Sequence, residues 1–228
     1  VEDTDTTTEE ITKMFSSDVA SLVDGVTKIG RLSFISKEEQ QAESIRKMLI
    51  AMGKDIRVIL IKLADRLHNM RTIQFMPSQK QRDKALETLE VYAPIAHRLG
   101  IRPIKEELED ISIAHLDPIA YKEIENLLIG NDKYRTEMLT SVKDKIGERL
   151  SKDMPDVKVE FQSRVKSING IYRKMFIQGK SFEEIYDIYA VRIITDTVAD
   201  CYNILGIIHD MFRPIPNRFK DYISTPKP

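Results

Sequence analysis

Two groups of polar residues in this chain have the types and spacing that catalysis or nucleotide binding requires. The first is Asp65, His68 and Asn69 in the segment KLADRLHNMRT, where residues three and four apart share one face of a helix. A carboxylate, an imidazole and an amide on one face can hold a metal ion or a phosphorylated ligand. The alternative is a surface ion pair between Asp65 and a nearby Lys or Arg, and spacing alone favours that alternative.

The second group is basic and surrounds the junction between a predicted strand and a predicted helix, at Arg164, Lys166, Arg173 and Lys174. A helix start offers free amides and a positive dipole end, so these cations predict a phosphate site; a solvated basic face is an equally good alternative. Asp187 precedes the β-branched run YAVRIIT, and a carboxylate at a strand entrance is a usual Mg²⁺ ligand in nucleotide-handling folds. No Gly-rich P-loop is present in the sequence.

Helices are the elements that must position the first group, because apolar residues in the N-terminal half recur at spacings of three and four. A capping box from Ser36 to Glu39 predicts a helix over about 37–52 that ends at Gly53. The next segment predicts a single apolar stripe opposite the polar group, made of Ile56, Leu60, Leu63, Leu67 and Met70.

The pattern of elements changes along the chain from helices to a mixture of strands and helices. A helix is predicted over 78–99, bent near Pro94 and ended by Gly100, and Asp117-Pro118 opens another. After Pro155, VKVEF alternates like a strand, SINGIYRKMF reads as a helix and YAVRIIT has the character of a buried strand. Two strands rarely form a stable sheet alone, so this α/β domain is expected to be incomplete.

Composition limits the class of protein. The 228 residues include 35 Lys and Arg against 36 Asp and Glu, which gives no global charge that would favour a nucleic acid or a membrane partner. The single Cys201 excludes an intramolecular disulfide, and no apolar run has the length of a bilayer span, so a cytoplasmic location is expected. The acidic start VEDTDTTTEE is no signal peptide, and both termini are expected to be internal to a longer chain.

Several motifs resemble one known family. VEDT followed by KLADRLHNMRT is similar to the hydrolase half of RelA/SpoT enzymes, an HD-type metallohydrolase, and RVKSI, IYRKM and YDIYAVR resemble the synthetase half of the same family. The likeness continues through FRPIPNRFKDYISTPKP. It implies an α+β chain, with part of an all-helical HD-type hydrolase domain over 1–118 and part of a mixed α/β nucleotidyltransferase-like synthetase domain over 119–228.

For the hydrolase half, the resemblance implies Mn²⁺-dependent removal of the 3′-pyrophosphate of ppGpp and pppGpp. Asp65 matches one metal ligand of the family, whereas a histidine and a His-Asp pair would lie upstream of Val1. Glu2 and Asp3 match catalytic residues that handle protons or orient the reacting groups. Asn69 and Thr72 match positions that line the guanine nucleotide.

For the synthetase half, the resemblance implies pyrophosphoryl transfer from ATP to the 3′-hydroxyl of GDP or GTP. Asp187 would be catalytic and hold Mg²⁺. The matching basic positions are Arg164 and Lys166 on the ATP side, Lys174 near its phosphates, and Lys220 and Lys227 on a loop over the substrates. An exposed charged turn is the alternative for Lys220 and Lys227.

The segment from Arg218 to Asp221 matches the R-x-K-D form of the family's bifunctional members, which predicts a two-activity stringent-response enzyme. Because each predicted site lacks family residues, the isolated chain is expected to be inactive. The alternative is a non-catalytic nucleotide-binding or regulatory module. No membrane and no nucleic-acid partner is predicted, since the charge balance is even.

Overall fold

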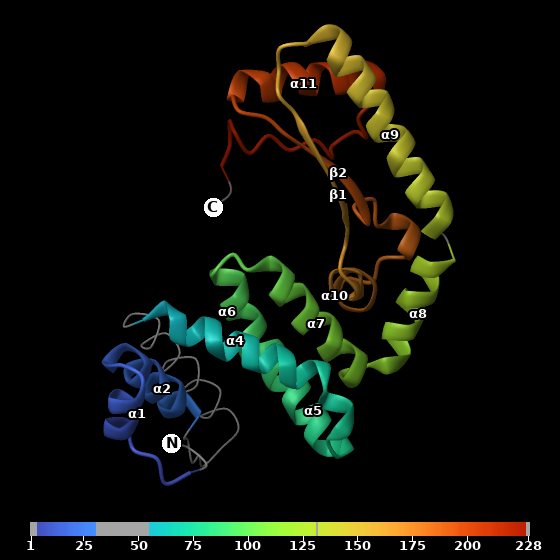
Figure 1. The fold of residues 1–228 in the computed structure, drawn as a ribbon. Helices are drawn as coiled ribbons and strands as arrows, with labels where there is room; N and C mark the ends of the chain where they lie inside the picture. The colour runs from blue at the N-terminus through green and yellow to red at the C-terminus, as the bar shows by residue number, and fades with distance from the viewer. Residues whose placement is uncertain (1–3, 31–54, 131, 227–228) are drawn as a thin grey trace. The chain divides into compact units, whose positions relative to one another are not determined.

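The computed structural model describes residues 4–30, 55–130 and 132–226, which divide into two compact units (Figure 1). The first unit contains the chain up to Glu123 together with Ser167–Tyr172, and the second contains Ile124–Lys166 and the chain from Arg173 onward. The chain thus leaves the second unit after Lys166 and returns to it at Arg173. The capping box at 36–39 and the helix predicted over 37–52 lie outside the described residues.

The described part of the first unit is helical. Its elements are α1 (Thr8–Met14), α2 (Ser17–Gly30), α4 (Ile56–Arg71), η1 (Ile73–Phe75), α5 (Ser78–Glu87), η2 (Thr88–Tyr92), α6 (Ala93–Arg98), α7 (Arg102–Leu116) and α10 (Ile168–Tyr172). Helix α8 (Pro118–Ile129) begins in this unit, and the Asp117 carboxylate accepts a hydrogen bond from the Ala120 amide at 3.1 Å, as expected for the cap before Pro118.

Helix α4 supplies much of the first core, but its apolar stripe is not the one that the sequence predicted. Leu63, Leu67 and Met70 are buried as expected. Ile56 and Leu60 are instead 51% and 43% exposed, and the first turns of α4 bury Val58 and Ile59. The reason is the contact with α2, in which Gly25 lies against the Val58 side chain and so turns that face of α4 inward.

The helix predicted over 78–99 is divided by a π turn, η2, between α5 and α6. The Ala93 amide donates to the Thr88 carbonyl five residues earlier, immediately before Pro94, which has no amide to donate. The predicted disturbance near Pro94 takes this form. Gly100 ends the segment with a φ of 72°, a conformation that glycine adopts without strain.

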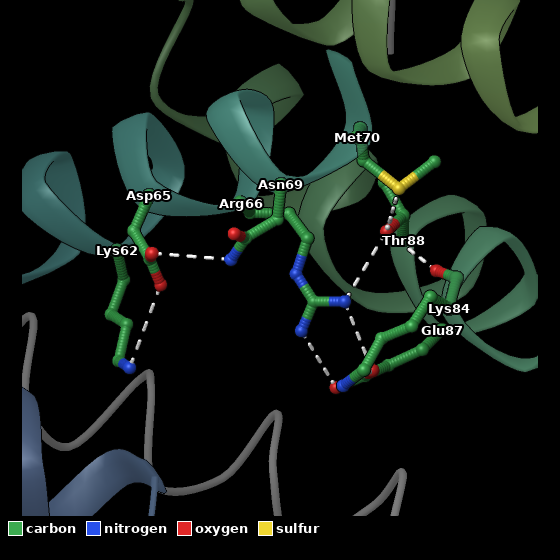
Figure 2. Close-up of polar contacts among 8 residues, drawn as sticks. All are labelled: Lys62, Asp65, Arg66, Asn69, Met70, Lys84, Glu87 and Thr88. Carbon is green, nitrogen blue, oxygen red and sulfur yellow. Dashed lines mark hydrogen bonds and ion pairs between the residues drawn. The ribbon is translucent and has the colours of Figure 1, made fainter. Parts of the chain in front are cut away.

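Arg66 joins α4 to this π turn from inside the core (Figure 2). Its guanidinium donates to both carboxylate oxygens of Glu87 at 3.0 Å and lies 3.9 Å from the centre of the Tyr92 ring. Lys84 contacts the same carboxylate at 3.0 Å. Burial raises the pKa of Glu87, but the charges and hydrogen bonds of Arg66 and Lys84 lower it by a larger amount, so the pKa lies below its ordinary value.

The second unit contains a short sheet and the helices packed on it. Its elements are α9 (Asp132–Asp153), β1 (Glu160–Val165), η3 (Arg173–Ile177), η4 (Phe182–Glu184), β2 (Tyr189–Ile194) and α11 (Val198–Met211). Strands β1 and β2 are antiparallel, with Glu160 opposite Ile194 and Val165 opposite Tyr189. Ile146, Leu150 and Ile204 form the core with Phe161 and Ile193.

Two predictions about these strands need correction. The first strand begins and ends later than VKVEF, because pairing with β2 selects Glu160–Val165 rather than the local alternation. The run YAVRIIT does not form a fully buried strand, since residues of β2 alternate between half-buried and exposed. One face of this pair packs on helices, which explains the alternation. Among the described residues, no helix is long and apolar enough to cross a membrane.

We predict that Gly25→Ala destabilises the first unit by about 1–2 kcal/mol, because an added Cβ overpacks a filled site. That Cβ would lie 2.9 Å from Val58 Cγ2, and a valine in a helix has essentially one rotamer. The matched control is Gly206→Ala in α11, where a Cβ meets nothing within 4 Å. The control is expected to stabilise by about 0.5 kcal/mol through helix propensity. Urea unfolding measures both, and equal effects of the two changes would contradict the packing argument.

We predict that Glu87→Gln lowers the free energy of unfolding by about 2 kcal/mol, because it leaves the buried Arg66 charge without its counter-charge. The lowered pKa of Glu87 means that the wild type loses this stability as pH falls through the folded-state pKa, below the ordinary value of 4.5. In urea unfolding, the free energy of unfolding of the variant should therefore fall less below pH 5 than that of the wild type. The control Glu123→Gln, at an exposed site, should follow the wild type.

Candidate functional site

The polar face predicted on α4 is present (Figure 2). Asn69 Nδ2 donates to Asp65 Oδ1 at 3.1 Å, and Lys62 Nζ lies 3.9 Å from Asp65 Oδ2. Asp65 and His68 are exposed, and Asn69 is half-buried. The contact with Lys62 is the surface ion pair that the sequence left open as an alternative, and at this distance and exposure it stabilises little.

Thr72 ends α4, and its hydroxyl donates to the His68 carbonyl at 3.1 Å. Asp65 can offer one carboxylate to a metal ion. Over residues 4–30, 55–130 and 132–226, however, no three His, Cys, Asp or Glu residues cluster in a way that could hold a metal. The described part of the chain therefore supplies a candidate ligand and a polar face for the predicted Mn²⁺ site, without a complete ligand set.

In the second unit, the strand register brings the predicted synthetase residues together. Val165 pairs with Tyr189, so Lys166 follows β1 at the point where Asp187 precedes β2, and the Lys166 amide donates to the Ile188 carbonyl at 2.7 Å. Lys166 Nζ lies 3.0 Å from Asp187 Oδ2. Lys174, from η3, reaches Asp187 Oδ1 at 2.6 Å. We call Lys166, Lys174 and Asp187 the lysine–aspartate cluster.

Electrostatics favour the ionised form of this aspartate. Partial burial raises the pKa of Asp187, but hydrogen bonds and charge from Lys174 and Lys166 lower it by a larger amount, to about 2. Two ammonium groups on one carboxylate leave an excess positive charge. Asp187 is also the most open member, since its side chain is 55% exposed against 16% for Lys166 and 26% for Lys174. The cluster can therefore receive an anion on its lysines and a cation on its carboxylate.

The R-x-K-D segment lies against the residue that precedes Asp187. The Arg218 guanidinium lies 5.3 Å from the centre of the Tyr186 ring, at cation–π distance. Asp221 shapes the turn, because its Oδ1 accepts the amides of Ile223 and Ser224 at 2.9 Å and its Oδ2 accepts the Tyr202 hydroxyl. Lys220, between them, is exposed.

The remaining predicted residues fall into two groups. Arg164 lies within β1, opposite Ala190, rather than in the loop after the strand where the sequence placed it. Glu2, Asp3 and Lys227 lie outside the described residues. Their predicted roles stay predictions.

Sequence reasoning missed three residues that organise these regions. Arg66 was overlooked because charged residues are normally exposed, and its burial depends on a partner 21 positions away. Tyr186 opens the motif YDIYAVR, but the sequence assigned it no role. Asp110 also gave no local signal, although its carboxylate accepts backbone amides of residues 58 and 59 positions later. Each depends on long-range contacts that periodicity does not reveal.

Comparison with known proteins agrees with these two regions. Residues 1–102 match the model of the HD domain, and residues 163–228 match a region found in RelA/SpoT proteins. The chain is 50% identical over 228 residues to a probable guanosine-3′,5′-bis(diphosphate) 3′-pyrophosphohydrolase of Synechocystis, covering 100% of the chain and 30% of that relative. It is 48% identical to a GTP pyrophosphokinase of Myxococcus xanthus, again covering 100% of the chain and 30% of the relative.

A third relative, the guanosine-3′,5′-bis(diphosphate) 3′-pyrophosphohydrolase of Spiroplasma citri, is 44% identical over 227 residues with the same coverage of 100% and 30%. The chain thus spans about a third of the length of these curated relatives. Both regions occur in the expected order, and the alignment runs through the helical part and the α/β part alike. On these grounds the chain belongs to the RelA/SpoT family.

Proposed function

We propose that this chain is part of a bifunctional enzyme that makes and hydrolyses ppGpp and pppGpp. The synthetase reaction would transfer the β,γ-pyrophosphoryl group of ATP to the 3′-oxygen of GDP or GTP and release AMP. The hydrolase reaction would remove that 3′-pyrophosphate with water. Relatives named for each of the two activities align with the whole chain, which supports both halves of the proposal.

The observation that carries the synthetase half is the lysine–aspartate cluster. Three residues chosen from the sequence for phosphate and Mg²⁺ binding converge, because the ammonium groups of Lys166 and Lys174 both lie within 3.0 Å of the Asp187 carboxylate, although 21 positions separate Lys166 from Asp187. Lysines are effective phosphate ligands because the ammonium is a compact charge with three donors. A triphosphate bound here would take over hydrogen bonds that Asp187 accepts in the free protein.

This exchange gives each residue of the cluster a role. Lys166 and Lys174 would hold and orient the phosphates, and Asp187, freed of two ammonium groups, would become a carboxylate with free oxygens. Mg²⁺ commonly binds through one or two carboxylates together with substrate phosphates, so one exposed aspartate fits such a site. When bound, the ion would offset the charge that develops on the transferred group.

The hydrolase half of the proposal has a narrower basis. The exposed face of α4 offers Asp65 as one candidate Mn²⁺ ligand and Asn69 as a polar group beside it, with Thr72 as a nucleotide contact at the helix end. Glu2 and Asp3 complete the proposed set.

A cytoplasmic location and the absence of membrane or nucleic-acid partners remain part of the proposal, and the free, exposed Cys201 is compatible with a reducing compartment.

We predict that Asp187→Asn lowers ppGpp synthesis by on the order of 100-fold or more and leaves hydrolysis unchanged, because it removes the charge that a Mg²⁺–nucleotide complex needs. The assay uses labelled ATP with GDP and follows ppGpp formation in a form of the protein extended at both ends. Asp156→Asn, at an exposed site, is the matched control. Equal synthesis by Asp187→Asn and the control would overturn the assignment of this cluster.

We predict the opposite pattern for Asp65→Asn, which should abolish Mn²⁺-dependent release of pyrophosphate from ppGpp and preserve synthesis, because an amide is a poor substitute for a carboxylate ligand. The 228-residue chain, assayed in parallel, is expected to be inactive in both directions. Turnover by this chain would contradict the predicted need for further residues. Nucleotide binding without turnover in the extended form as well would favour the non-catalytic module.

A further inference from the structure

The segment Ser167–Tyr172 belongs to the helical unit although both of its neighbours in sequence belong to the α/β unit. It forms α10, which packs on α7 (Figure 1). Its side chains are enclosed by the fold, since Ile171 is fully buried and Asn169 is only 4% exposed. The helix on which it packs, α7, belongs to the first unit.

Polar contacts fix the position of the segment at both ends. At its start, Asp110 on α7 accepts the Asn169 amide at 2.8 Å through Oδ1 and the Ile168 amide at 3.3 Å through Oδ2. At its end, the Tyr172 hydroxyl donates to Asp117 Oδ2 at 3.2 Å. A carboxylate with one oxygen for each amide is a directional contact, and it fits only one orientation of the α10 backbone.

The segment is flanked directly by the two lysines of the cluster. Lys166 is bonded to Ser167, and Lys174 follows Tyr172 by two residues. Both ammonium groups meet at Asp187, within 3.0 Å. The path between the two lysines therefore runs through a segment that α7 holds, so a displacement of α10 must move the backbone next to both lysines.

We propose that Asp110 is a positioning residue for the lysine–aspartate cluster, and that it acts by fixing α10 between Lys166 and Lys174. The occupant of the cluster would be the triphosphate of a nucleotide. This consequence for ATP rests on the proposed synthetase function, whereas the effect on the lysines does not.

The electrostatics of Asp110 separate this role from simple stabilisation. Burial raises the pKa of Asp110, the amides of Asn169 and Ile168 lower it, and the charges of Glu109 and Glu106 raise it again, so that the pKa is about 6. A carboxyl group whose pKa is raised in the fold stabilises the protein at pH values below its ordinary pKa, and this contribution is lost as the pH rises through 6. At neutral pH the ionised Asp110 is thus kept at a cost to stability.

The first experiment measures amine reactivity in the 228-residue chain at pH 7.5, with acetic anhydride as the probe and peptide mass spectrometry as the readout. Asp110→Asn preserves the shape but turns one acceptor oxygen into an amide donor that faces a backbone N–H. We expect acetylation of Lys166 and Lys174 to rise about threefold or more relative to the exposed Lys152, as expected for loss of a backbone anchor. Asp156→Asn should leave both rates unchanged.

Stability distinguishes positioning from general damage. The urea midpoint of Asp110→Asn at pH 7.5 should stay close to that of the wild type, because removal of a buried charge offsets the loss of one amide contact. If the variant fails to fold, Tyr172→Phe loosens the other end of the segment and should raise the same two acetylation rates. Unchanged reactivity in a folded Asp110→Asn protein would overturn the proposal.

The second experiment tests the consequence for the nucleotide in the form extended at both ends. Asp110→Asn should raise the KM for ATP severalfold with a smaller change in kcat, and with no change in ppGpp hydrolysis. A wild type that makes no ppGpp would refute the proposed function while the acetylation result still decided the role of Asp110. Unchanged ATP kinetics together with unchanged lysine reactivity would refute the positioning role alone.

Discussion

The buried guanidinium of Arg66 is the constraint around which the helical unit is organised. An arginine cannot lose its proton in a protein, so a folded state that buries this group must bring a carboxylate to it. Glu87 supplies that carboxylate from the last residue of α5, and Tyr92 covers the guanidinium from the π turn. One side of α4 is therefore tied to a fixed stretch of chain. Asp65, the residue before Arg66 in α4, stays exposed, and Asn69 is half-buried.

The π turn can be understood in the same terms. Tyr92 must reach the Arg66 guanidinium while Pro94, two residues later, cannot donate a hydrogen bond to the preceding turn. A hydrogen bond from the Ala93 amide to the carbonyl of Thr88, five residues earlier, allows both. In this way a local weakness of the helix at proline coincides with the buried ion pair. Helical irregularity and buried charge are parts of one arrangement.

The sequence predicted those features that are written into neighbouring residues. The cap at Asp117, the stop at Gly100 and the strand after Asp187 all follow from short-range chemistry, and so does the common face of Asp65 and Asn69. The exposure of Ile56 and Leu60 did not follow, because it depends on which face α2 covers. The same limit applies to Asp110 and Arg66, whose partners lie far along the chain. The sequence predicted the three members of the lysine–aspartate cluster, but it did not predict their contacts, which depend on the register of β1 and β2.

The passage of the chain from one unit to the other and back has a consequence for dissection of the protein. No single cut separates the two units, because Ser167–Tyr172 belongs to the helical unit while its flanks belong to the α/β unit. A synthetase fragment that starts after α7 would expose Ile171 to water and leave two amides of α10 without their acceptor. A fragment cut at one position in the sequence would therefore lack part of its unit. When either part is exchanged between relatives, α7 and α10 must come from the same protein.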